Sequence, residues 1–367
     1  MTLPTTRPAR LLIPVLITTF VACSLFEPDE KTCPPSYRKS GDDCILDTTS
    51  HDFTWETDVL AQAGYIYGVF ALSPTDVWVV GDFQDYDPPS LRINAAHWDG
   101  TSWERRAAEP KPVANDVIAF APDDVWMAAG IPMHWDGSNW NNYHLWEMGV
   151  LSVTDGGTIS VWGTSSSDLY FAGRLGTFVH YDGETFTIIP TNTDMRLQSM
   201  AGTTKGNVWI TGDLSAVRSK LFSFRKGTWS TVWDVDHPFF DFQDEYGYDY
   251  VSVEALFVVN DDYLVLNVAG RDQMISIHRL DNFSNFDTLS SPETSWLKAA
   301  DGNDINDFFF VGQNDAMFHY NGASFKTFEF GSNPLSVWWQ DVDQIGDYVF
   351  VVGSTDQGPT VLRGIRN

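Results

Sequence analysis

The chain has 367 residues and is strongly acidic, with 22 basic and 49 acidic side chains and a formal net charge of −27. A surface of this charge repels phosphate backbones, so nucleic acid is a poor partner. It also repels anionic lipid head groups, so any membrane attachment would depend on a lipid anchor only. We assign most of the charge to the solubility of a large β-protein.

Residues 1–22 have the three parts of an export signal. Arg7 and Arg10 form the positive end, and the apolar run Leu11–Val21 is too short to span a bilayer comfortably. The run ends in Phe20-Val-Ala-Cys23, which resembles the lipobox of bacterial lipoproteins, with Phe in place of the usual Leu. In that family the cysteine becomes the lipidated first residue after cleavage, so the resemblance implies lipidation of Cys23. The alternative is an ordinary signal peptide in which Cys23 is incidental.

Residues 23–50 would then be a lipidated tether. With Cys23 lipidated, Cys33 and Cys44 are left as a pair, and we expect a disulfide that closes a short loop in an oxidising envelope. Such a loop stabilises by about 3 kcal/mol. The alternatives are two free thiols, or a zinc site for which two cysteines are too few. By resemblance to enteric lipoprotein sorting, Ser24 implies the bacterial outer membrane, with the protein periplasmic or surface-exposed.

One repeat dominates residues 51–367. Asp76-Val-Trp-Val-Val-Gly81 is followed by His97-Trp-Asp-Gly-Thr-Ser-Trp103, and related runs recur along the chain. The Gly or Asn that ends the first run lies at positions 81, 130, 173, 212, 267, 312 and 353. A spacing roughly in the forties with an aromatic and Gly signature predicts four-stranded propeller blades. We therefore predict an all-β protein with one domain, a seven-bladed β-propeller of antiparallel blades.

Each repeat divides into strands a to d. In the first repeat, strand a covers Tyr67–Leu72, strand b covers Val77–Val80, strand c ends at Trp98 and strand d starts near Trp103. Asp-Gly or Asn-Gly between strands c and d predicts a tight type I′ hairpin. The aromatic residues that flank this hairpin, which include Tyr181 and Phe186 in a later copy, are expected to pack between blades.

The last repeat lacks a strand d. Only Pro359–Arg363 remains after Gly353, which is enough for strand c alone. Phe53–Glu56 precedes the first strand a and resembles Ser102–Glu104. We predict that the N-terminal strand completes the last blade, because closure removes the free sheet edges of an open ring.

Recurring polar residues account for most of the candidate chemistry. Five of the eight histidines precede the c–d turn at equivalent positions, which indicates a role in the fold: His97, His134, His180, His278 and His319. Recurring aspartates are expected to cap the a–b turn: Asp124, Asp168, Asp262, Asp307 and Asp347. The run Asp301–Asp307 lacks the Gly and Glu of an EF-hand loop, so we expect an Asx turn there. No motif for nucleophilic catalysis, zinc or phosphate binding occurs, and no catalytic residue, metal site or cofactor is predicted from the repeat.

The repeat resembles a broad class of secreted bacterial propellers that carry Val-Trp-x-x-Gly and His-Trp-Asp-Gly-x-x-Trp elements. The resemblance covers residues 53–367 and implies the fold, but that class has no common activity to carry over. The Ser-x-Asp-x-Gly-x-x-Trp box of sialidase propellers is absent. The propeller lipoprotein of the outer-membrane barrel assembly machine is an analogy in anchor and architecture, without a motif match.

Two insertions interrupt the repeat. Gln84–Asn94 lies between strands b and c of the first blade, and Asp234–Tyr250 lies between the fourth and fifth blades. Because b–c and d–a connections leave a blade on the same side, both insertions should lie on one face of the disc. Their aromatic side chains suit recognition of sugars or protein side chains. The candidate ligand-binding residues are Tyr86, Asp234, Phe239, Phe240, Phe242, Asp244, Glu245, Tyr246 and Tyr248. The clustered carboxylates could instead hold calcium or a basic partner, or the loop could bury its own aromatics.

Three functions fit these features. The leading hypothesis is a lipid-anchored, monomeric binding module or scaffold that recognises a protein or a glycan of the envelope or cell surface. The rival is a hydrolase or lyase acting on polysaccharide, and a glycosidase would need two carboxylates within roughly 5 to 10 Å of each other. The third is a structural envelope component without a discrete ligand. The fold alone does not decide between them.

Overall fold

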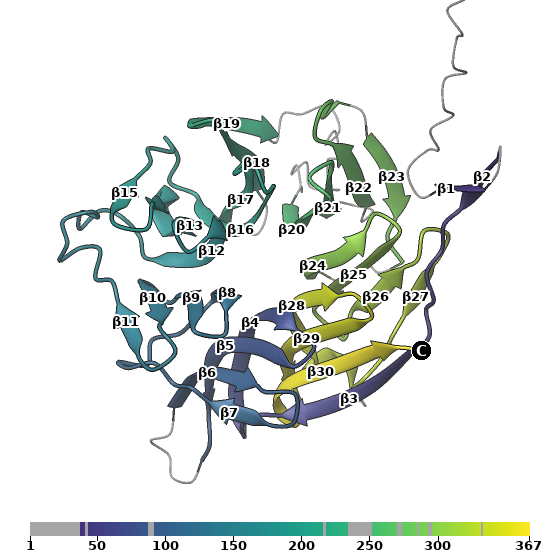
Figure 1. The fold of residues 1–367 in the computed structure, drawn as a ribbon, viewed down its shortest axis with the longest axis horizontal. Coiled ribbons are helices and arrows are strands. Elements are labelled where there is room, and N and C mark those ends of the chain that lie inside the picture. The colour runs from purple at the N-terminus through teal and green to yellow at the C-terminus, as the bar shows by residue number, and fades with distance from the viewer. Residues whose placement is uncertain are drawn as a thin grey trace, which may run out of the picture.

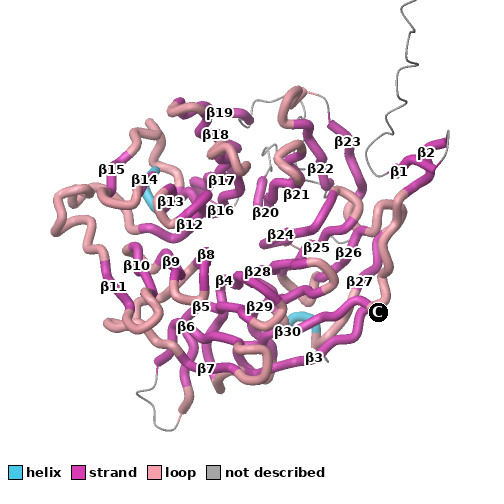
Figure 2. The backbone as a smooth tube through the Cα atoms, viewed as in Figure 1, coloured by secondary structure: helices cyan, strands magenta, loops and turns pink. Residues whose placement is uncertain are grey.

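The predicted seven-bladed propeller is confirmed. The computed structural model describes residues 37–40, 43–86, 92–215, 218–233, 252–269, 274–284, 286–292, 296–331 and 333–367. These residues form seven four-stranded antiparallel sheets around one axis, together with a two-stranded hairpin at the rim (Figure 1). The short 3-10 helices η1 (Arg174–Gly176) and η3 (Pro334–Ser336) lie among strands, turns and loops (Figure 2).

The blades follow chain order, and strand a of each blade lines the centre. Blade 1 contains β4 (Ala63–Ser73), β5 (Asp76–Gln84), β6 (Arg92–Trp98) and β7 (Trp103–Arg105). Blade 2 contains β8 (Asp116–Ala121), β9 (Asp124–Ala128), β10 (Pro132–Trp135) and β11 (Trp140–Asn142). Blade 3 contains β12 (Thr158–Ser165), β13 (Asp168–Gly173), β14 (Phe178–Tyr181) and β15 (Phe186–Ile188). Blade 4 contains β16 (Arg196–Gly202), β17 (Val208–Ser215), β18 (Arg218–Arg225) and β19 (Thr228–Trp233).

The remaining blades have the same order, with one exception at the end. Blade 5 contains β20 (Ser252–Val259), β21 (Tyr263–Ala269), β22 (Met274–Arg279) and β23 (Phe286–Ser290). Blade 6 contains β24 (Leu297–Asp304), β25 (Asp307–Gly312), β26 (Met317–Tyr320) and β27 (Phe325–Thr327). Blade 7 contains β28 (Trp338–Ile345), β29 (Tyr348–Thr355), β30 (Gly358–Arg366) and β3 (Phe53–Val59). The hairpin consists of β1 (Tyr37–Ser40) and β2 (Asp43–Leu46).

The two ends of the chain close the ring. β3 pairs antiparallel with β30 from Phe53 opposite Arg366 to Val59 opposite Thr360, and it supplies strand d of blade 7 (Figure 1). The predicted closure from Phe53–Glu56 is confirmed, and the strand extends three residues further. Side chains join this seam to blade 1, because Asp58 accepts hydrogen bonds from Arg363 (2.6 Å) and from the indole of Trp103 (3.0 Å). The outer edge of β30 is therefore paired rather than open to other chains.

The hydrophobic core lies between blades rather than at the centre of the disc. Buried side chains form seven clusters, each chiefly between two neighbouring blades. Trp78, Trp126 and Trp209 of strand b are each 1% exposed. Truncating a buried aromatic of this size typically costs about 3–5 kcal/mol. The expected packing of the c–d aromatics is confirmed, with Trp98 against blade 7 and Tyr181 against blade 2.

The c–d hairpins lie where predicted, but the predicted type I′ geometry is wrong for the Asp-Gly copies and for the Asn321-Gly322 copy. Trp98 pairs with Trp103, so the first of these loops has four residues, and within it only Gly100 has a positive φ (91°). The carboxylate of Asp99 accepts bonds from the hydroxyl of Thr101 (2.7 Å) and from the two backbone N–H groups after Gly100 (2.8 Å each). These bonds lower the pKa of Asp99 to about 2. An Asx turn thus replaces the second left-handed residue.

Blade 4 has the type I′ turn that was predicted for the Asp-Gly and Asn-Gly copies. Arg225 pairs with Thr228 across a two-residue loop. Both loop residues, Lys226 (φ 50°) and Gly227 (φ 75°), are left-handed, as type I′ geometry requires. The type I′ turn therefore occurs in a copy without Asp or Asn before the glycine.

Packing explains why glycine recurs near the end of strand b. A Cβ on Gly81 would lie 2.2 Å from the carbonyl oxygen of Tyr65, and one on Gly173 would lie 2.2 Å from that of Gly157. Both carbonyls belong to the backbone that runs beside the end of strand b. The recurring glycine therefore permits a close approach of two backbones that any side chain would prevent.

Candidate functional site

The two faces of the disc are formed by different connections. The b–c and d–a connections lie on one face, called here the connection face, and the a–b and c–d turns lie on the opposite turn face. The connection face comprises residues 60–62, 85–86, 106–115, 129–131, 143–157, 174–177, 189–195, 291–292, 296, 313–316, 328–331, 333–337 and 356–357 of the described chain. This arrangement follows from the up-and-down order of four strands in each blade.

Exposed apolar side chains gather on the connection face. Ten large, exposed apolar residues lie in its connections or close to the strand ends that border them: Val59, Tyr65, Tyr86, Trp146, Met148, Val153, Leu175, Ile188, Leu335 and Trp338. Val153 is 98% exposed and Leu335 is 73% exposed. The c–d turns of the opposite face carry acidic residues instead, such as Asp99, Asp136 and Asp182. Exposed apolar side chains concentrated on one surface mark interaction sites.

The loop 143–157 presents three of these side chains from an ordered backbone. Leu145 and Leu151 are buried and anchor the loop against blades 2 and 3. The backbone turns on itself through a hydrogen bond from the N–H of Met148 to the carbonyl of His144 (3.0 Å). The indole of Trp146 donates to the carbonyl of Ser152 (3.0 Å) at the other end of the loop. These bonds hold the loop in one shape without burying its apolar tip.

A neighbouring loop extends this surface. The hydroxyl of Thr177 donates to the carbonyl of Gly156 (3.0 Å) and accepts from its N–H (2.9 Å), which joins residues 174–177 to loop 143–157. Gly176 then donates to the carbonyl of Met195 (2.7 Å) in the next d–a connection. Leu175 lies between these contacts with a left-handed φ of 55° and a side chain 58% exposed. A bulky residue held in this conformation costs about 1–3 kcal/mol, and such strain concentrates at functional surfaces.

The predicted ligand-binding residues are only partly within the described chain. Tyr86 lies on the connection face as expected and is 65% exposed, with its N–H bonded to the side chain of Gln62 (2.7 Å). The insertion Asp234–Tyr250, and with it all eight other candidates, lies outside the described residues. Those candidates are Asp234, Phe239, Phe240, Phe242, Asp244, Glu245, Tyr246 and Tyr248. Calcium binding by this insertion stays a prediction from the sequence.

The sequence did not reveal loop 143–157 as a candidate. The spacing between Gly130 and Gly173 is close to the average, because a short b–c connection offsets the long d–a connection. The signal available in the sequence was the run Tyr143–Leu151, which matches no part of the repeat. It includes Trp146, which is exposed in the structure.

Cys23 and Cys33 also lie outside the described residues, so the lipid anchor and the disulfide stay predictions. Cys44 lies on β2 opposite Lys39 of β1.

A channel of about 330 Å³ runs along the axis of the disc. Strand a of every blade contributes to its wall. Its apolar lining includes Tyr67, Trp162 and Phe257, and its polar lining includes Gln198 and Lys298. The volume of the channel is near the lower limit of the range of about 300–1,000 Å³ that is usual for small-molecule sites.

Four aspartates of the channel wall join neighbouring blades through backbone N–H groups. Asp116 of blade 2 accepts from Val161 of blade 3 (2.9 Å). The other three bonds are Asp301 of blade 6 with Gln344 of blade 7 (2.7 Å), Asp341 of blade 7 with Val69 of blade 1 (2.9 Å), and Asp343 of blade 7 with Ala71 of blade 1 (2.6 Å). Burial raises the pKa of all four carboxyls, and that of Asp343 to about 6. The repeat did not predict this role, because the four aspartates occur in only three blades.

The closest of these carboxyls lack the geometry of a glycosidase. Asp301 and Asp343 hydrogen-bond directly to each other, so they share a proton instead of standing roughly 5 to 10 Å apart. Each is also committed to a backbone N–H group. In the calcium-like run, Asp304 accepts from the N–H of Ile305 (2.7 Å), whereas Asp307 faces a histidine, so these carboxylates have separate partners.

Four of the five recurring histidines pair with the recurring aspartate of their own blade. The Nε2–Oδ1 distance is 2.9 Å for His97 with Asp76 and 2.8 Å for the other three pairs, His134 with Asp124, His180 with Asp168 and His319 with Asp307. The predicted fold role is confirmed. The expected capping of the a–b turn is found for Asp168, which accepts from Thr164 (2.6 Å), and for Asp307, which accepts from Asn303 (2.8 Å). The imidazole that strand c brings to the start of strand b is a second partner that the sequence did not predict.

The fifth recurring histidine is held differently. His278 of blade 5 donates from Nδ1 to the carbonyl of Phe283 (3.0 Å) and stacks on that ring. It is fully buried. The recurring position is therefore kept for packing even where its aspartate contact is replaced.

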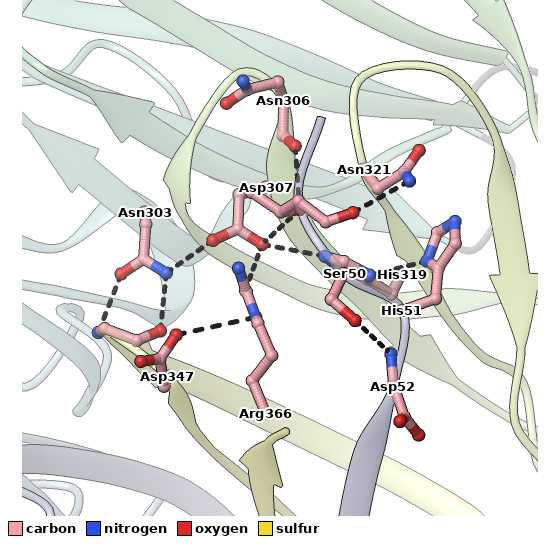
Figure 3. Close-up of polar contacts among 12 residues, drawn as sticks. Ser50, His51, Asp52, Asn303, Asn306, Asp307, His319, Asn321, Asp347 and Arg366 are labelled. Atoms are coloured by element: carbon pink, nitrogen blue, oxygen red, sulfur yellow. Dashed lines mark hydrogen bonds and ion pairs between the residues drawn. The ribbon is translucent and has the colours of Figure 1, made fainter. Parts of the chain in front are cut away.

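Residues 47–52, called here the strap, run along the turn face of blade 6 before β3 begins. Figure 3 shows Ser50, His51 and Asp52 beside the turns that carry Asn306 and Asn321. His51 lies against His319, with 2.8 Å between the two Nδ1 atoms. The chain upstream of the disc thus leaves from the turn face.

Comparisons with known proteins support the fold and no more than the fold. No family model matches the chain, and no curated protein matches it. Among solved structures, YCF48 bound to D1 peptide is similar with a TM-score of 0.63 and 14% identity, covering 88% of this chain and 100% of that one. YCF48 from Cyanidioschyzon merolae has a TM-score of 0.60, 13% identity and coverage of 85% and 98%. The WD40 β-propeller domain of Doa1 has a TM-score of 0.61, 11% identity and coverage of 87% and 98%.

Within the described ranges, no group of three or more His, Cys, Asp or Glu side chains is placed to hold a metal ion. No helix in that part of the chain has the length and apolar character to cross a bilayer.

Proposed function

We propose that the protein is a binding scaffold that recognises a protein partner through its connection face. The observation that carries the proposal is the concentration of exposed apolar side chains on this face, around loop 143–157 and Leu175. Aromatic residues and methionine are the types enriched in protein–protein interfaces, and Trp146 and Met148 are of these types. One of the solved structures with a similar fold contains a bound peptide, which supports this role.

The buried channel favours an outer-surface partner over a small substrate. Its aspartates already accept backbone hydrogen bonds that hold blades together. Displacing them would disrupt the ring, so the channel wall is poorly suited to rearrange around a reacting ligand. A polysaccharide hydrolase or lyase is not favoured by any specific feature of the described residues.

The position of the strap indicates which face of the disc is turned away from the membrane anchor. We infer from the lipobox resemblance that Cys23 carries a lipid in the bacterial outer membrane, on its periplasmic or outer side. The strap leaves the disc on the turn face at Asn321 and Asn306. The connection face lies on the other side of the disc, so the anchor leaves it accessible to a partner.

The test is site-specific photo-crosslinking in cells that produce the full chain. A photoreactive residue replaces Val153, whose side chain makes almost no contact within the protein. We expect one discrete protein adduct, lost when Trp146 and Met148 are both changed to serine. The matched control is Ile365→Ser, which alters a 41% exposed apolar residue at the turn-face end of β30.

A second probe position tests whether the adduct depends on the connection face. A photoreactive residue at Glu184, in the c–d turn of blade 3, should give no such adduct. An adduct that forms equally from Glu184, or that survives the double serine variant, would contradict recognition by the connection face. An adduct with glycan instead of protein would assign the surface to the other class of partner and reject the proposal.

A further inference from the structure

The strap is fastened to blade 6 at both of its turns. In the a–b turn, the side-chain amide of Asn306 donates to the carbonyl of Asp47 in the strap (2.8 Å). In the c–d turn, the N–H of Thr49 donates to the carbonyl of Asn321 (3.3 Å), and the amide of Asn321 donates back to the carbonyl of Thr49 (3.0 Å). Only then does the chain enter β3 and its pairing with β30 (Figure 3).

A row of hydrogen bonds through two imidazoles completes the attachment. His319 Nε2 lies 2.8 Å from the Asp307 carboxylate, the two Nδ1 atoms of His319 and His51 lie 2.8 Å apart, and His51 Nε2 lies 3.1 Å from the hydroxyl of Ser324. Because His319 donates to Asp307 from Nε2, its neutral form accepts at Nδ1 from the Nδ1–H of His51. His51 Nε2 then accepts a hydrogen bond from the hydroxyl of Ser324.

Only one hydrogen fits between the two facing Nδ1 atoms. If both rings are protonated, two N–H groups point at each other across 2.8 Å and their bond is lost. His319 is fully buried within blade 6, whereas His51 belongs to the strap. The ring that can move away is therefore His51.

Charged groups of both signs surround the pair. Lys326 donates from Nζ to the carbonyl of His51 (3.2 Å), and Arg366 donates to Asp307 (2.5 Å) and lies 3.8 Å from Asp347. The carboxylate of Asp307 is the acidic group in direct contact with His319, and the side chain of Asp52 follows on the strap. Protonation of the pair thus adds charge next to two cations that are already present.

The pKa values follow from this setting. Burial lowers the pKa of His51 to about 4, with further lowering by the charges of His319, Lys326 and Arg366 against the raising effect of Asp307. Burial also lowers the pKa of His319. Asp307 itself keeps a pKa of about 2, because bonds from His319, Asn303 and Arg366 outweigh the effect of its burial.

We propose that the strap is an acid-released latch, held on blade 6 by a neutral His51–His319 pair and loosened as the imidazoles take up protons. β3 stays in place, because its pairing with β30 involves neither imidazole. Release gives the segment upstream of Phe53 freedom to change the orientation of the disc. A detached His51 titrates near its ordinary pKa of about 6.5, so attachment weakens as pH falls from there towards about 4. The attachment constant should fall by on the order of 10- to 100-fold across this range.

The test is hydrogen exchange of individual amides in the full chain between pH 7.5 and pH 4, corrected for the intrinsic rate at each pH. The reporter is the N–H of Thr49, which is bonded to Asn321 in the attached strap. We expect its protection to fall by on the order of 10- to 100-fold while the amides of Phe53–Val59 stay protected. In the His51→Gln variant, Thr49 protection should no longer change with pH.

The matched control is His134→Gln. His134 makes the same contact with its aspartate but faces no second imidazole, so this variant should keep the pH dependence at Thr49. Side-chain ¹⁵N titration of His51 in the unmodified chain gives an independent measure if a variant fails to fold. The proposal is overturned if Thr49 protection is constant to pH 4, if it falls together with that of β3, or if His51→Gln retains the full pH dependence.

Discussion

Replacing Phe53 with alanine should destabilise the entire ring, because this residue anchors the strand that closes it. Phe53 is 8% exposed and packs in blade 7 against Phe309 (ring centroids 5.3 Å apart) and Phe328 (6.1 Å) of blade 6. The guanidinium of Arg366 lies 5.2 Å from its ring. Truncating a buried phenylalanine costs about 3–5 kcal/mol. At about 2 °C per kcal/mol for a domain of this size, Tm should fall by about 6–10 °C.

Thermal and urea unfolding of the mature chain measure this loss. The matched control is Phe186→Ala, which truncates a 7% exposed phenylalanine of strand d in blade 3. The two variants should lose similar stability in a single transition, because strand d of blade 7 is as integral to the ring as that of blade 3. A loss below about 1 kcal/mol for Phe53→Ala, beside several for Phe186→Ala, would show that β3 is dispensable.

A circular permutation separates closure from the identity of the chain end. The permuted chain begins at Ala63, joins Arg366 to Phe53 through a copy of the four-residue loop 99–102, and ends at Gln62. The pairing of Phe53 with Arg366 matches that of Trp103 with Trp98, so the loop should fit. We expect Tm within a few degrees of the parent. A permuted chain that does not fold would refute the view that β3 acts as an ordinary strand d.

Three further predictions test the buried polar groups and the anchor. Stability should rise by about 1–2 kcal/mol as pH falls from 7 towards 5, because the folded state holds a proton between Asp301 and Asp343 that the unfolded chain releases, and this gain is lost as pH rises through about 6. Urea midpoints in the His51→Gln background, with and without Asp343→Asn, measure this gain. An equal dependence on pH in both variants would contradict the prediction. His134→Gln should cost about 1–2 kcal/mol in urea unfolding, since its bond to Asp124 is only partly exposed. Cys23→Ser should release the protein from the membrane fraction, whereas continued palmitate labelling of that variant would reject the anchor.

The fold was predictable because its signals repeat. Seven copies of an aromatic strand with Gly or Asn at its end indicated the number of blades. The strand missing after Gly353 identified Phe53–Glu56 as its replacement. The turn type was mispredicted because Asp-Gly is compatible with both type I′ and Asx loops, and the choice depends on hydrogen bonds to Asp99. Pairing of aspartate and histidine was also missed, since the partners are 10 to 21 residues apart and meet only through strand register.

The candidate site was less predictable than the fold, because its members occur once each. Loop 143–157 fits no repeat, and whether its apolar residues are core or surface depends on tertiary packing that buries Leu145 and exposes Met148. The contact between His51 and His319 joins positions 268 residues apart. The sequence around His51 does not indicate that its side chain contacts a second imidazole.

The two faces of the disc differ because the repeat constrains only one of them. The turn face combines the a–b and c–d turns with the aspartate–histidine pairs, so a change in turn length there would break a bond that recurs in four blades. Five of the seven a–b turns accordingly have two residues between the strands. The connection face carries no such recurring bond, and its d–a connections range from residues 60–62 to residues 143–157 among those fully described. Variation in length and apolar exposure therefore accumulate on the same side, opposite the strap, which is why a partner specific to this chain is expected on the connection face.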